Sequence, residues 1–374
     1  MSFISTLCHY IAPMQGVSGK LIPHWGWFVP GLACVGVVVS LAAPLPVAVV
    51  AILLAGAVIA AVHHAELVAH RIGEPYGTLV LALAVTVIEL GLIVTLMSAA
   101  GEGAATLARD TVFAAVMIIL NGLIGICLLI GGLRHREQSF QQTGVSASLA
   151  TLSALTVFSL VLPNYTVSEA GPVYSASQLA FVAIVSVILY GTFVAVQTVR
   201  HRDYFLPPRD KVADEDAHAE RPTARAAGLS FALLLACLVS VVLLAKQLAD
   251  PIEAVVAHWG APHALVGVII AALVLLPESV AAIRATLANR LQTSLNLALG
   301  SALATIGLTI PAVAALSMAM AMPIALGLDS KSMVLLMLTL LVSAQALATG
   351  KTTILQGVVH LVIFGVYLFT TIIP

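Results

Sequence analysis

Two glutamates, Glu89 and Glu278, stand as isolated charges inside long apolar stretches of the sequence. The first stretch, residues 77–99, has 23 residues, and Glu89 lies 12 residues after its start. A helix of that length crosses a hydrocarbon core of about 30 Å, so Glu89 falls near mid-depth. A charge at that depth costs at least about 2.5 kcal/mol, and an intramembrane acidic residue therefore marks a functional site by default.

Carboxylates at this depth can bind cations or protons, and neighbouring residues offer further oxygen atoms. Thr86 lies three residues before Glu89, on the same face of a helix. Pro277 directly precedes Glu278, and its missing N–H and its ring open the helix and free backbone carbonyls. Because Ca²⁺ takes about six to eight oxygen ligands, this set of donors suits a hard cation.

Two asparagines and several hydroxyls supply the remaining candidate donors. Asn121 lies in the apolar stretch 111–133, and Asn296, Ser301 and Thr305 lie in the stretch 293–318. An amide is costly in lipid, which favours a site role, whereas a serine or threonine hydroxyl also serves helix packing, so both interpretations stay open for Ser301 and Thr305. We predict these ligands for a transported metal cation: Glu89, Glu278, Asn296, Ser301, Thr86 and Asn121.

The composition is that of a membrane protein. The chain is 60% hydrophobic and 9% charged, against about 25% charged residues in a soluble domain. Continuous apolar runs, rather than short alternating segments, predict an all-α polytopic protein and not a barrel. Eleven apolar segments are predicted to span the membrane: 27–42, 45–66, 77–99, 111–133, 145–162, 177–198, 226–244, 264–285, 293–318, 332–347 and 352–372.

The same composition limits the partners. The net charge of −1 and the scarcity of charge give no indication of a nucleic-acid partner, so the lipid bilayer is the expected surrounding. The four cysteines are scattered and indicate packing, not a disulfide frame or a metal site. The N-terminus lacks the pattern of a cleaved signal peptide, so the first span is expected to direct insertion. No cofactor is expected, and association into a homo-oligomer stays open.

The positive charges give an orientation. If the N-terminus and every second loop share one side, that side holds 13 of the Lys and Arg residues. The other side holds three, Arg109, Lys246 and Lys331. Because Lys and Arg accumulate in cytoplasmic loops, the N-terminus is predicted to be cytoplasmic.

A short repeat precedes both acidic spans. The chain reads V-A-H-R-I-G-E-P at 68–75 and V-A-H-W-G-A-P at 256–262. Glu89 and Glu278 each lie in the second span of a group of five, and the two groups enter the membrane from opposite sides. This predicts an inverted repeat with a midplane site. The domains are then 1–44 with the first helix, 45–199 as the first repeat, the charged cytoplasmic linker 200–225, and 226–374 as the second repeat.

Polar residues near the repeat motif are candidates for gating or proton relay. Glu66 and Glu253 precede the two motifs, and His64 lies two residues before Glu66. A histidine there can shuttle protons, but it can equally be an ordinary residue at the membrane boundary. We therefore keep Glu66, Glu253 and His64 as gating or relay candidates and not as cation ligands.

At these residues the chain resembles the calcium/cation antiporter superfamily, and within it the bacterial ChaA-type, CAX-like calcium/proton exchangers. The resemblance rests on five motifs: G-E-P-Y-G-T-L at 73–79, V-T-V-I-E at 85–89, Q-T-V-R-H-R-D-Y-F at 197–205, L-L-P-E at 275–278 and N-R-L-Q-T-S-L-N-L-A-L-G-S-A-L-A at 289–304. It implies two inverted five-helix halves after one extra helix, a bacterial inner-membrane location, and paired glutamates that exchange a cation for protons.

Two positions depart from that pattern. Many proton-coupled relatives have Gly-Asn where this chain has Val85-Thr86, and many have His where it has Ser279. These departures bear on which cation is selected. The resemblance thus implies export of Ca²⁺ in exchange for protons, with Na⁺ or K⁺ as additional cargo, and the alternative is a monovalent Na⁺(K⁺)/H⁺ antiporter.

Other function classes fit the sequence less well. An intramembrane metalloprotease needs a cluster such as H-E-x-x-H, and the residues around His64 and Glu66 lack that spacing. A passive channel has no need of a repeated, titratable site. We therefore expect a transporter with alternating access and not an enzyme.

Overall fold

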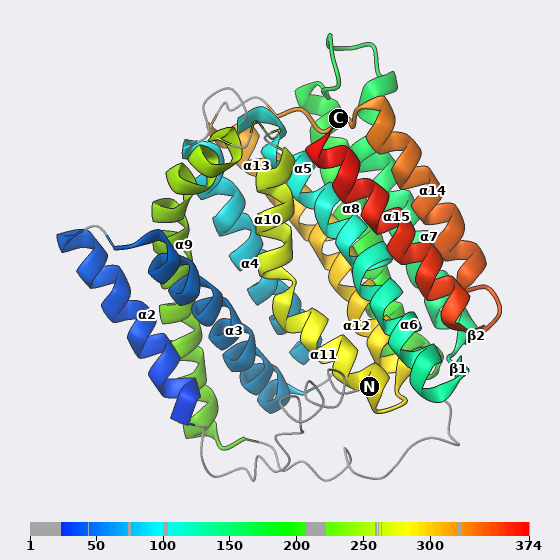
Figure 1. The fold of residues 1–374 in the computed structure, drawn as a ribbon, viewed down its shortest axis with the longest axis horizontal. Helices are drawn as coiled ribbons and strands as arrows, with labels where there is room; N and C mark the ends of the chain where they lie inside the picture. The colour runs from blue at the N-terminus through cyan, green and yellow to red at the C-terminus, as the bar shows by residue number, and fades with distance from the viewer. Residues whose placement is uncertain are drawn as a thin grey trace.

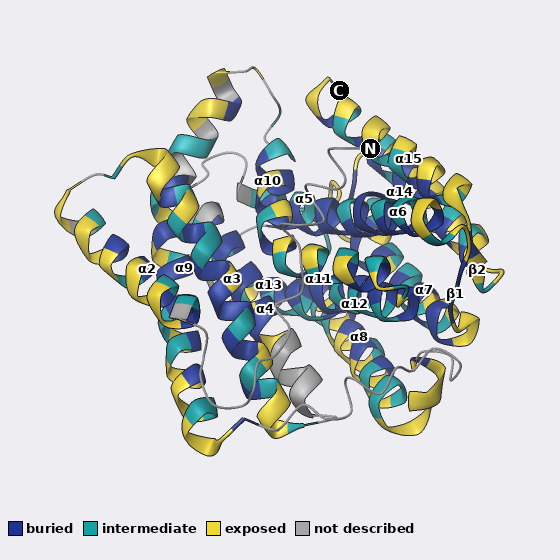
Figure 2. Ribbon diagram, turned by 60° about the horizontal axis from the view of Figure 1, so that its bottom comes forward, coloured by how far each residue is buried: buried dark blue, intermediate teal, exposed yellow. Residues whose placement is uncertain are grey.

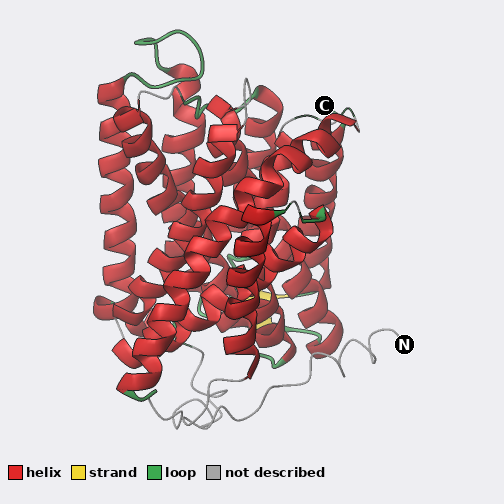
Figure 3. Ribbon diagram, turned by 90° about the vertical axis from the view of Figure 1, so that its left-hand side faces the viewer, coloured by secondary structure: helices red, strands yellow, loops and turns green. Residues whose placement is uncertain are grey.

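The computed structural model describes residues 24–43, 45–73, 76–99, 104–206, 222–258, 260, 262, 264–320 and 324–373. The chain forms a bundle of helices that run nearly parallel, with loops at both ends (Figure 1 and Figure 3). In the first part of the chain the helices are α2 His24–Ala42, α3 Val47–Ile72, α4 Tyr76–Ala99, α5 Ala104–Met117, η1 Ile118–Leu123, α6 Ile124–His135, α7 Gln142–Thr156, η2 Val157–Val161, η3 Leu162–Tyr165, α8 Ala176–Ala195, η4 Val196–Arg200 and η5 Arg202–Tyr204. In the second part they are α9 Ala224–His258, α10 Ala264–Val274, α11 Leu276–Leu287, α12 Leu291–Ala304, η8 Thr305–Thr309, α13 Ile310–Met320, α14 Ser330–Ala346 and α15 Ile354–Ile372.

The all-α membrane architecture predicted from the sequence is confirmed. Among the described residues, seven helical segments are long and apolar enough to cross a membrane, or eight if the bent pair α10–α11 counts as one span. Three shorter apolar helices cover residues 25–40, 83–95 and 330–346. Because those three fall short of a full span by length, the count of eleven stays a prediction, as do the repeat boundaries.

Local sequence signals set several helix starts. Ser175 and Gln178 form a reciprocal capping box at the start of α8, and Thr353 and Gln356 form another at the start of α15. The side chain of Asp329 accepts a hydrogen bond from the Ser332 N–H at 3.3 Å and caps α14. These bonds satisfy N–H groups that have no partner within the helix.

The helices pack in pairs that are distant in sequence. Helix α3 lies between α2, α4 and α9, α5 packs against α10, and α6 packs against α15 (Figure 1). Large apolar side chains of α8 and α15, such as Phe181, Ile188 and Val362, face outward, and buried residues gather where helices meet (Figure 2). An apolar outer surface is what a bundle surrounded by lipid requires.

Three helices are irregular near their centres. The segment η1 is a wide π-helical turn between α5 and α6, and η8 is a similar turn between α12 and α13. Helices α10 and α11 meet at a bend of 55° just before Pro277. Such interruptions free backbone groups and concentrate at functional sites.

A two-stranded antiparallel ladder closes one end of the bundle. Strand β1, Gln138–Ser139, pairs with β2, Lys351–Thr352, with Gln138 opposite Thr352. The Gln138 Nε2 group donates to the Asn289 Oδ1 atom at 3.0 Å and so reaches the turn between α11 and α12. We call this end the strand end. At the opposite end, Ala325 N–H donates to the Ala105 carbonyl at 2.8 Å.

The contact between α6 and α15 depends on a glycine. A Cβ atom at Gly357 would lie 2.5 Å from the Leu129 backbone nitrogen, whereas a Cβ at Gly365 on the same helix would meet nothing within 4 Å. We expect Gly357→Ala to force the helices apart and to cost about 1–3 kcal/mol of stability. Gly365→Ala should be neutral or slightly stabilising, since alanine favours helix. Thermal unfolding of the purified protein in detergent measures both, and equal melting temperatures would contradict the packing.

Candidate functional site

Glu89 is buried in the middle of α4, where its carboxylate meets the second half of the chain. Its side chain is 2% exposed. The Thr309 hydroxyl donates to Glu89 Oε2 at 3.0 Å, and the Thr305 hydroxyl also hydrogen-bonds to this carboxylate. Each bond to a charged acceptor contributes about 1.5–3 kcal/mol. Glu89 is therefore held by two hydroxyls from η8.

The turn η8 decides where those hydroxyls point. Thr305 and Thr309 begin and end the π-helical segment, and Ser301 lies four residues earlier on α12. Spacing by four residues places side chains on neighbouring turns of one helix face. The Ser301 hydroxyl is buried and has no hydrogen-bond partner among the described residues. A polar strip of three hydroxyls thus extends along the helix from the Glu89 contact.

Glu278 occupies the start of a broken helix. It is the third residue of α11, after the bend of 55°, and its side chain is 8% exposed. The first N–H groups of a helix have no partner within it, and the helix dipole is positive there, so this position favours a carboxylate. Pro277 has no N–H to donate to the Leu273 carbonyl, four residues earlier. In the described part of the chain Glu278 Oε2 is buried without a hydrogen bond.

The two glutamates belong to one electrostatic site. Glu278 lies close enough to Glu89 and to Glu66 for its charge to interact with each of them. Glu66 comes from α3, which contacts α11, and its side chain is exposed. The structure thus brings together the two residues of the sequence prediction and adds the gating candidate Glu66 beside them.

Of the other four predicted ligands, two lie near Glu89 or on the hydroxyl strip, and two form hydrogen bonds elsewhere. Thr86 is 5% exposed and lies one turn from Glu89, and Ser301 lies on the hydroxyl strip. Asn121, in η1, instead donates from Nδ2 to Thr339 Oγ1 at 2.8 Å. Asn296 lies nine residues before Thr305, about 13 Å along the helix. Its Nδ2 group donates to the Phe205 carbonyl at 2.5 Å.

Sequence reasoning missed Thr309 and left Thr305 undecided between site and packing. The signal that could have identified Thr309 is the continued spacing by four from Ser301 through Thr305. A threonine is common in membrane helices, however, and the sequence does not reveal the wide turn at η8. All six ligand assignments stay predictions, including those of Asn121 and Asn296.

The relay candidate His64 lies where α3 packs against α2. His64 Nε2 is 2.8 Å from the Gly26 carbonyl, and the His63 ring lies 4.6 Å from the Trp25 ring, so both histidines tie α3 to α2. The backbone of Glu253 belongs to α9, but its side chain lies outside the described residues. No described contact links His64 to a carboxylate.

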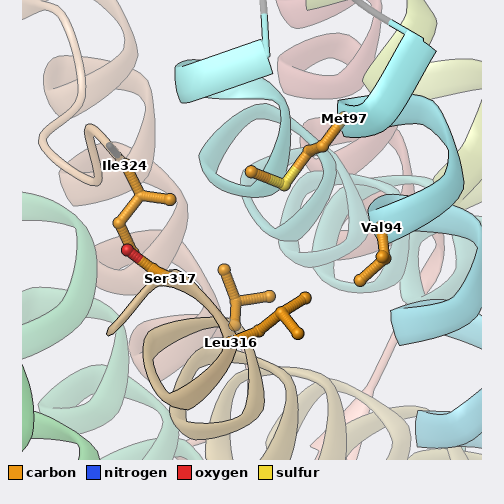
Figure 4. Close-up of a pocket in the computed structure, with 6 residues that line it drawn as sticks. Val94, Met97, Leu316, Ser317 and Ile324 are labelled. Carbon is orange, nitrogen blue, oxygen red and sulfur yellow. The ribbon is translucent and has the colours of Figure 1, made fainter. Parts of the chain in front are cut away.

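Beyond Glu89, α4 and α13 enclose a small hollow toward the C-terminal end of α4 (Figure 4). Its lining is apolar apart from Ser317 and comprises Val94, Met97, Val313, Leu316, Ser317 and Ile324. At about 10 Å³ it has room for roughly one water molecule. The hollow itself is too small for a hydrated ion.

Paired intramembrane carboxylates beside a discontinuous helix define a secondary transporter. The sequence matches the family described as sodium/calcium exchanger protein over residues 43–199 and 229–373. The chain belongs to this family, which confirms the resemblance drawn from the motifs. It is a multi-pass membrane protein of a family of cation exchangers.

Individual proteins support the same placement. The chain is 50% identical over 359 residues to y4hA of Sinorhizobium fredii (strain NBRC 101917 / NGR234), named as an ionic transporter, covering 94% of this chain and 97% of that one. It is 35% identical over 310 residues to the sodium-potassium/proton antiporter ChaA of Escherichia coli (strain K12), covering 83% and 84%. The structure of the H⁺/Ca²⁺ exchanger CAX matches with a TM-score of 0.69 at 16% identity, covering 93% and 89%, and supports the fold.

The hydroxyl bond to Glu89 yields a test. Thr309→Val keeps the shape of the side chain but removes the donor, so we expect the KM for the transported cation to change by about tenfold or more, the factor of one charge-assisted hydrogen bond. Thr309→Ser keeps the hydroxyl and should retain the parent KM within about twofold. Exchange in membrane vesicles measures both. Equal KM values for Thr309→Val and the parent would show that the bond does not shape the site.

Proposed function

We propose that this protein exports cytoplasmic Ca²⁺, and Na⁺ or K⁺ as further cargo, in exchange for external protons by alternating access at a site built on Glu89 and Glu278. The observation that carries the proposal is the meeting of two buried carboxylates, one from each predicted half, within range of each other's charge. The hydroxyls of Thr305 and Thr309 complete the Glu89 side of this site.

Electrostatics explains why such a site exchanges ions. Two ionised carboxylates close together in a dry core repel each other and lack hydration, so the empty, doubly charged site is costly. One divalent cation or two protons remove that cost, and each occupant excludes the other. The binding of the cation therefore releases protons, and an inward proton gradient drives the cation outward.

The oxygen atoms near Glu89 and Glu278 suit a cation that is bound and then released. Carboxylates, hydroxyls and the freed carbonyl of Leu273 are ligands that hard cations accept. Thr86 and Ser301 lie on the helix faces next to the pair and are proposed as further ligands, together with Asn121 and Asn296. The proposed ligand set mixes strong carboxylates with weaker neutral oxygens, which allows release as well as binding.

A monovalent exchanger is the second candidate. It is supported by ChaA, a relative named as a sodium-potassium/proton antiporter and 35% identical to this chain. Calcium is supported by the fold shared with the H⁺/Ca²⁺ exchanger CAX. The two candidates share the site and the proton coupling and differ in the ion.

The proposed orientation in the membrane follows from the uneven distribution of Lys and Arg between the loops on the two sides. We place the protein in the bacterial inner membrane with a cytoplasmic N-terminus, so the strand end faces the cytoplasm and Arg109 faces outward. The halves 45–199 and 226–374 then act as the two parts that rock against each other. Glu66, which lies beside Glu278, is placed on the cytoplasmic path to the pair.

Inverted membrane vesicles test the function directly. A pH gradient, acid inside, is established and followed by fluorescence while Ca²⁺, Na⁺ or K⁺ is added in turn at several pH values. We expect Ca²⁺ to dissipate the gradient at the lowest concentration. Dissipation by Na⁺ and K⁺ alone would establish the monovalent alternative, and no response to any of the three would overturn the proposal.

The same assay tests the site. Glu89→Gln and Glu278→Gln each remove one charge, so we expect exchange to fall to the level of vesicles without the protein. Glu137→Gln is the control, because Glu137 lies at the strand end with a side chain that is 61% exposed and a 3.7 Å ion pair to Lys351. It should exchange like the parent. Exchange by Glu89→Gln with an unchanged pH response would refute the site assignment.

A further inference from the structure

The π-helical turns η1 and η8 differ in how they contact the two site glutamates. The turn η8 offers two hydroxyls, and Glu89 receives both. The turn η1 contacts α11, the helix that begins with Glu278, and its polar side chain is Asn121. Yet, within the described chain, Glu278 Oε2 is buried with no hydrogen bond. Glu89 is thus bonded by η8, whereas the Glu278 carboxylate is bonded to its own backbone N–H and keeps one oxygen without a partner in the described chain.

The reason is that the Asn121 amide is occupied elsewhere. Its Nδ2 group donates to Thr339 Oγ1 of α14 at 2.8 Å, and its Oδ1 atom lies 3.2 Å from Nδ1 of His360 on α15. Because Oδ1 can only accept, the His360 ring donates from Nδ1. Asn121, His360 and Thr339 are all 0% exposed, so no water competes for these bonds.

The surroundings complete this polar cluster. The Thr339 hydroxyl, which accepts from Asn121, lies 3.5 Å from the Met117 sulfur and can donate to it. The His360 ring also bonds to the Leu120 backbone in η1. The cluster therefore fixes both the amide and the backbone of the turn. Buried polar groups of this kind hold one arrangement because an unpaired alternative is costly.

We propose that His360 and Thr339 form a docking site that holds the Asn121 amide away from Glu278, and that release of this amide lets it join the cation at Glu278. The inference rests on the proposed function, since it assigns Asn121 a second position at the same ion site. His360 and Thr339 are then positioning residues. They touch neither the cation nor Glu278, and they set the share of molecules in which Asn121 is available.

Competition between the docking site and the cation site for Asn121 predicts the direction in which the KM changes. The apparent affinity of a site is reduced by the fraction of molecules in the competent state. Removal of one docking bond raises that fraction, by about 3- to 10-fold for a typical hydrogen bond. A cluster that only supports the fold would lower the amount or stability of the protein and leave the KM unchanged.

The test uses the full-length protein in inverted vesicles with Ca²⁺, Na⁺ and K⁺ as probes. We expect His360→Leu and Thr339→Val to lower the KM for the cation that the parent exchanges by about 3- to 10-fold. The maximal rate should also fall, because both variants weaken the docked state. His360→Asn, which can place an N–H near the Nδ1 position, should restore the KM toward the parent value. Thr371→Val is the matched control, because the Thr371 hydroxyl on the same helix bonds to its own Tyr367 carbonyl at 2.8 Å.

A double variant separates docking from other effects. In an Asn121→Ala background, His360→Leu should leave the KM at the value of Asn121→Ala alone. An unchanged or raised KM in His360→Leu and Thr339→Val overturns the docking, and so does a lowered KM that persists without Asn121. If His360→Leu does not reach the membrane, the KM of the nearly isosteric Thr339→Val decides whether the docking site exists. Glu278→Gln in the same vesicles tests the proposed function separately. Full exchange by Glu278→Gln refutes the site. If Glu278→Gln is inactive and Thr339→Val has an unchanged KM, only the docking is refuted.

Discussion

The hydrogen bond from Thr309 to Glu89 is the contact on which the centre of this protein depends. A carboxylate in a dry bundle is tolerated only if donors, cations or protons compensate it, and the backbone N–H groups around Glu89 are already used within α4. The donors come from η8, in the other half of the chain. The bond therefore joins the first and second parts of the chain at a buried carboxylate.

The irregular backbone follows from the same need. A regular helix presents side chains but keeps its own carbonyls and N–H groups paired. The turns η1 and η8 and the bend before Pro277 give up some of that pairing near the centre of the membrane. Non-helical backbone at such a depth is tolerated only inside the protein. The turns η1 and η8 consist mostly of buried residues, and Leu275 and Glu278 are buried on either side of the bend. They place Thr305, Thr309 and Glu278 where a straight helix could not.

The sequence identified site residues whose burial costs much free energy, and it did not identify those whose burial costs little. Glu89 and Glu278 were predicted because a lone charge in an apolar run is visible in one dimension. Thr309 was missed, since a hydroxyl costs little in a membrane helix and its direction depends on η8. Asn121 was recognised as polar and buried, but its partners Thr339 and His360 come from helices more than 200 residues away in sequence. The helical membrane architecture followed from composition, whereas the number of spans depends on helix lengths that apolar runs do not define.

Contacts at both ends of the bundle constrain how the centre can open. At the strand end, Gln138 reaches Asn289, and Asn296 holds the Phe205 carbonyl at the start of the charged linker. At the opposite end, Arg109 donates to the Gly327 carbonyl at 3.1 Å, and the loop before α14 bonds to the start of α5. These are single hydrogen bonds to backbone or amide groups and not buried ion pairs. The neutral bonds contribute about 0.5–1.5 kcal/mol each and the bond from the charged Arg109 about 1.5–3 kcal/mol. Such bonds can exchange one at a time, and under the proposed function the free energy of one cation or of two protons at the carboxylate pair shifts which end is closed.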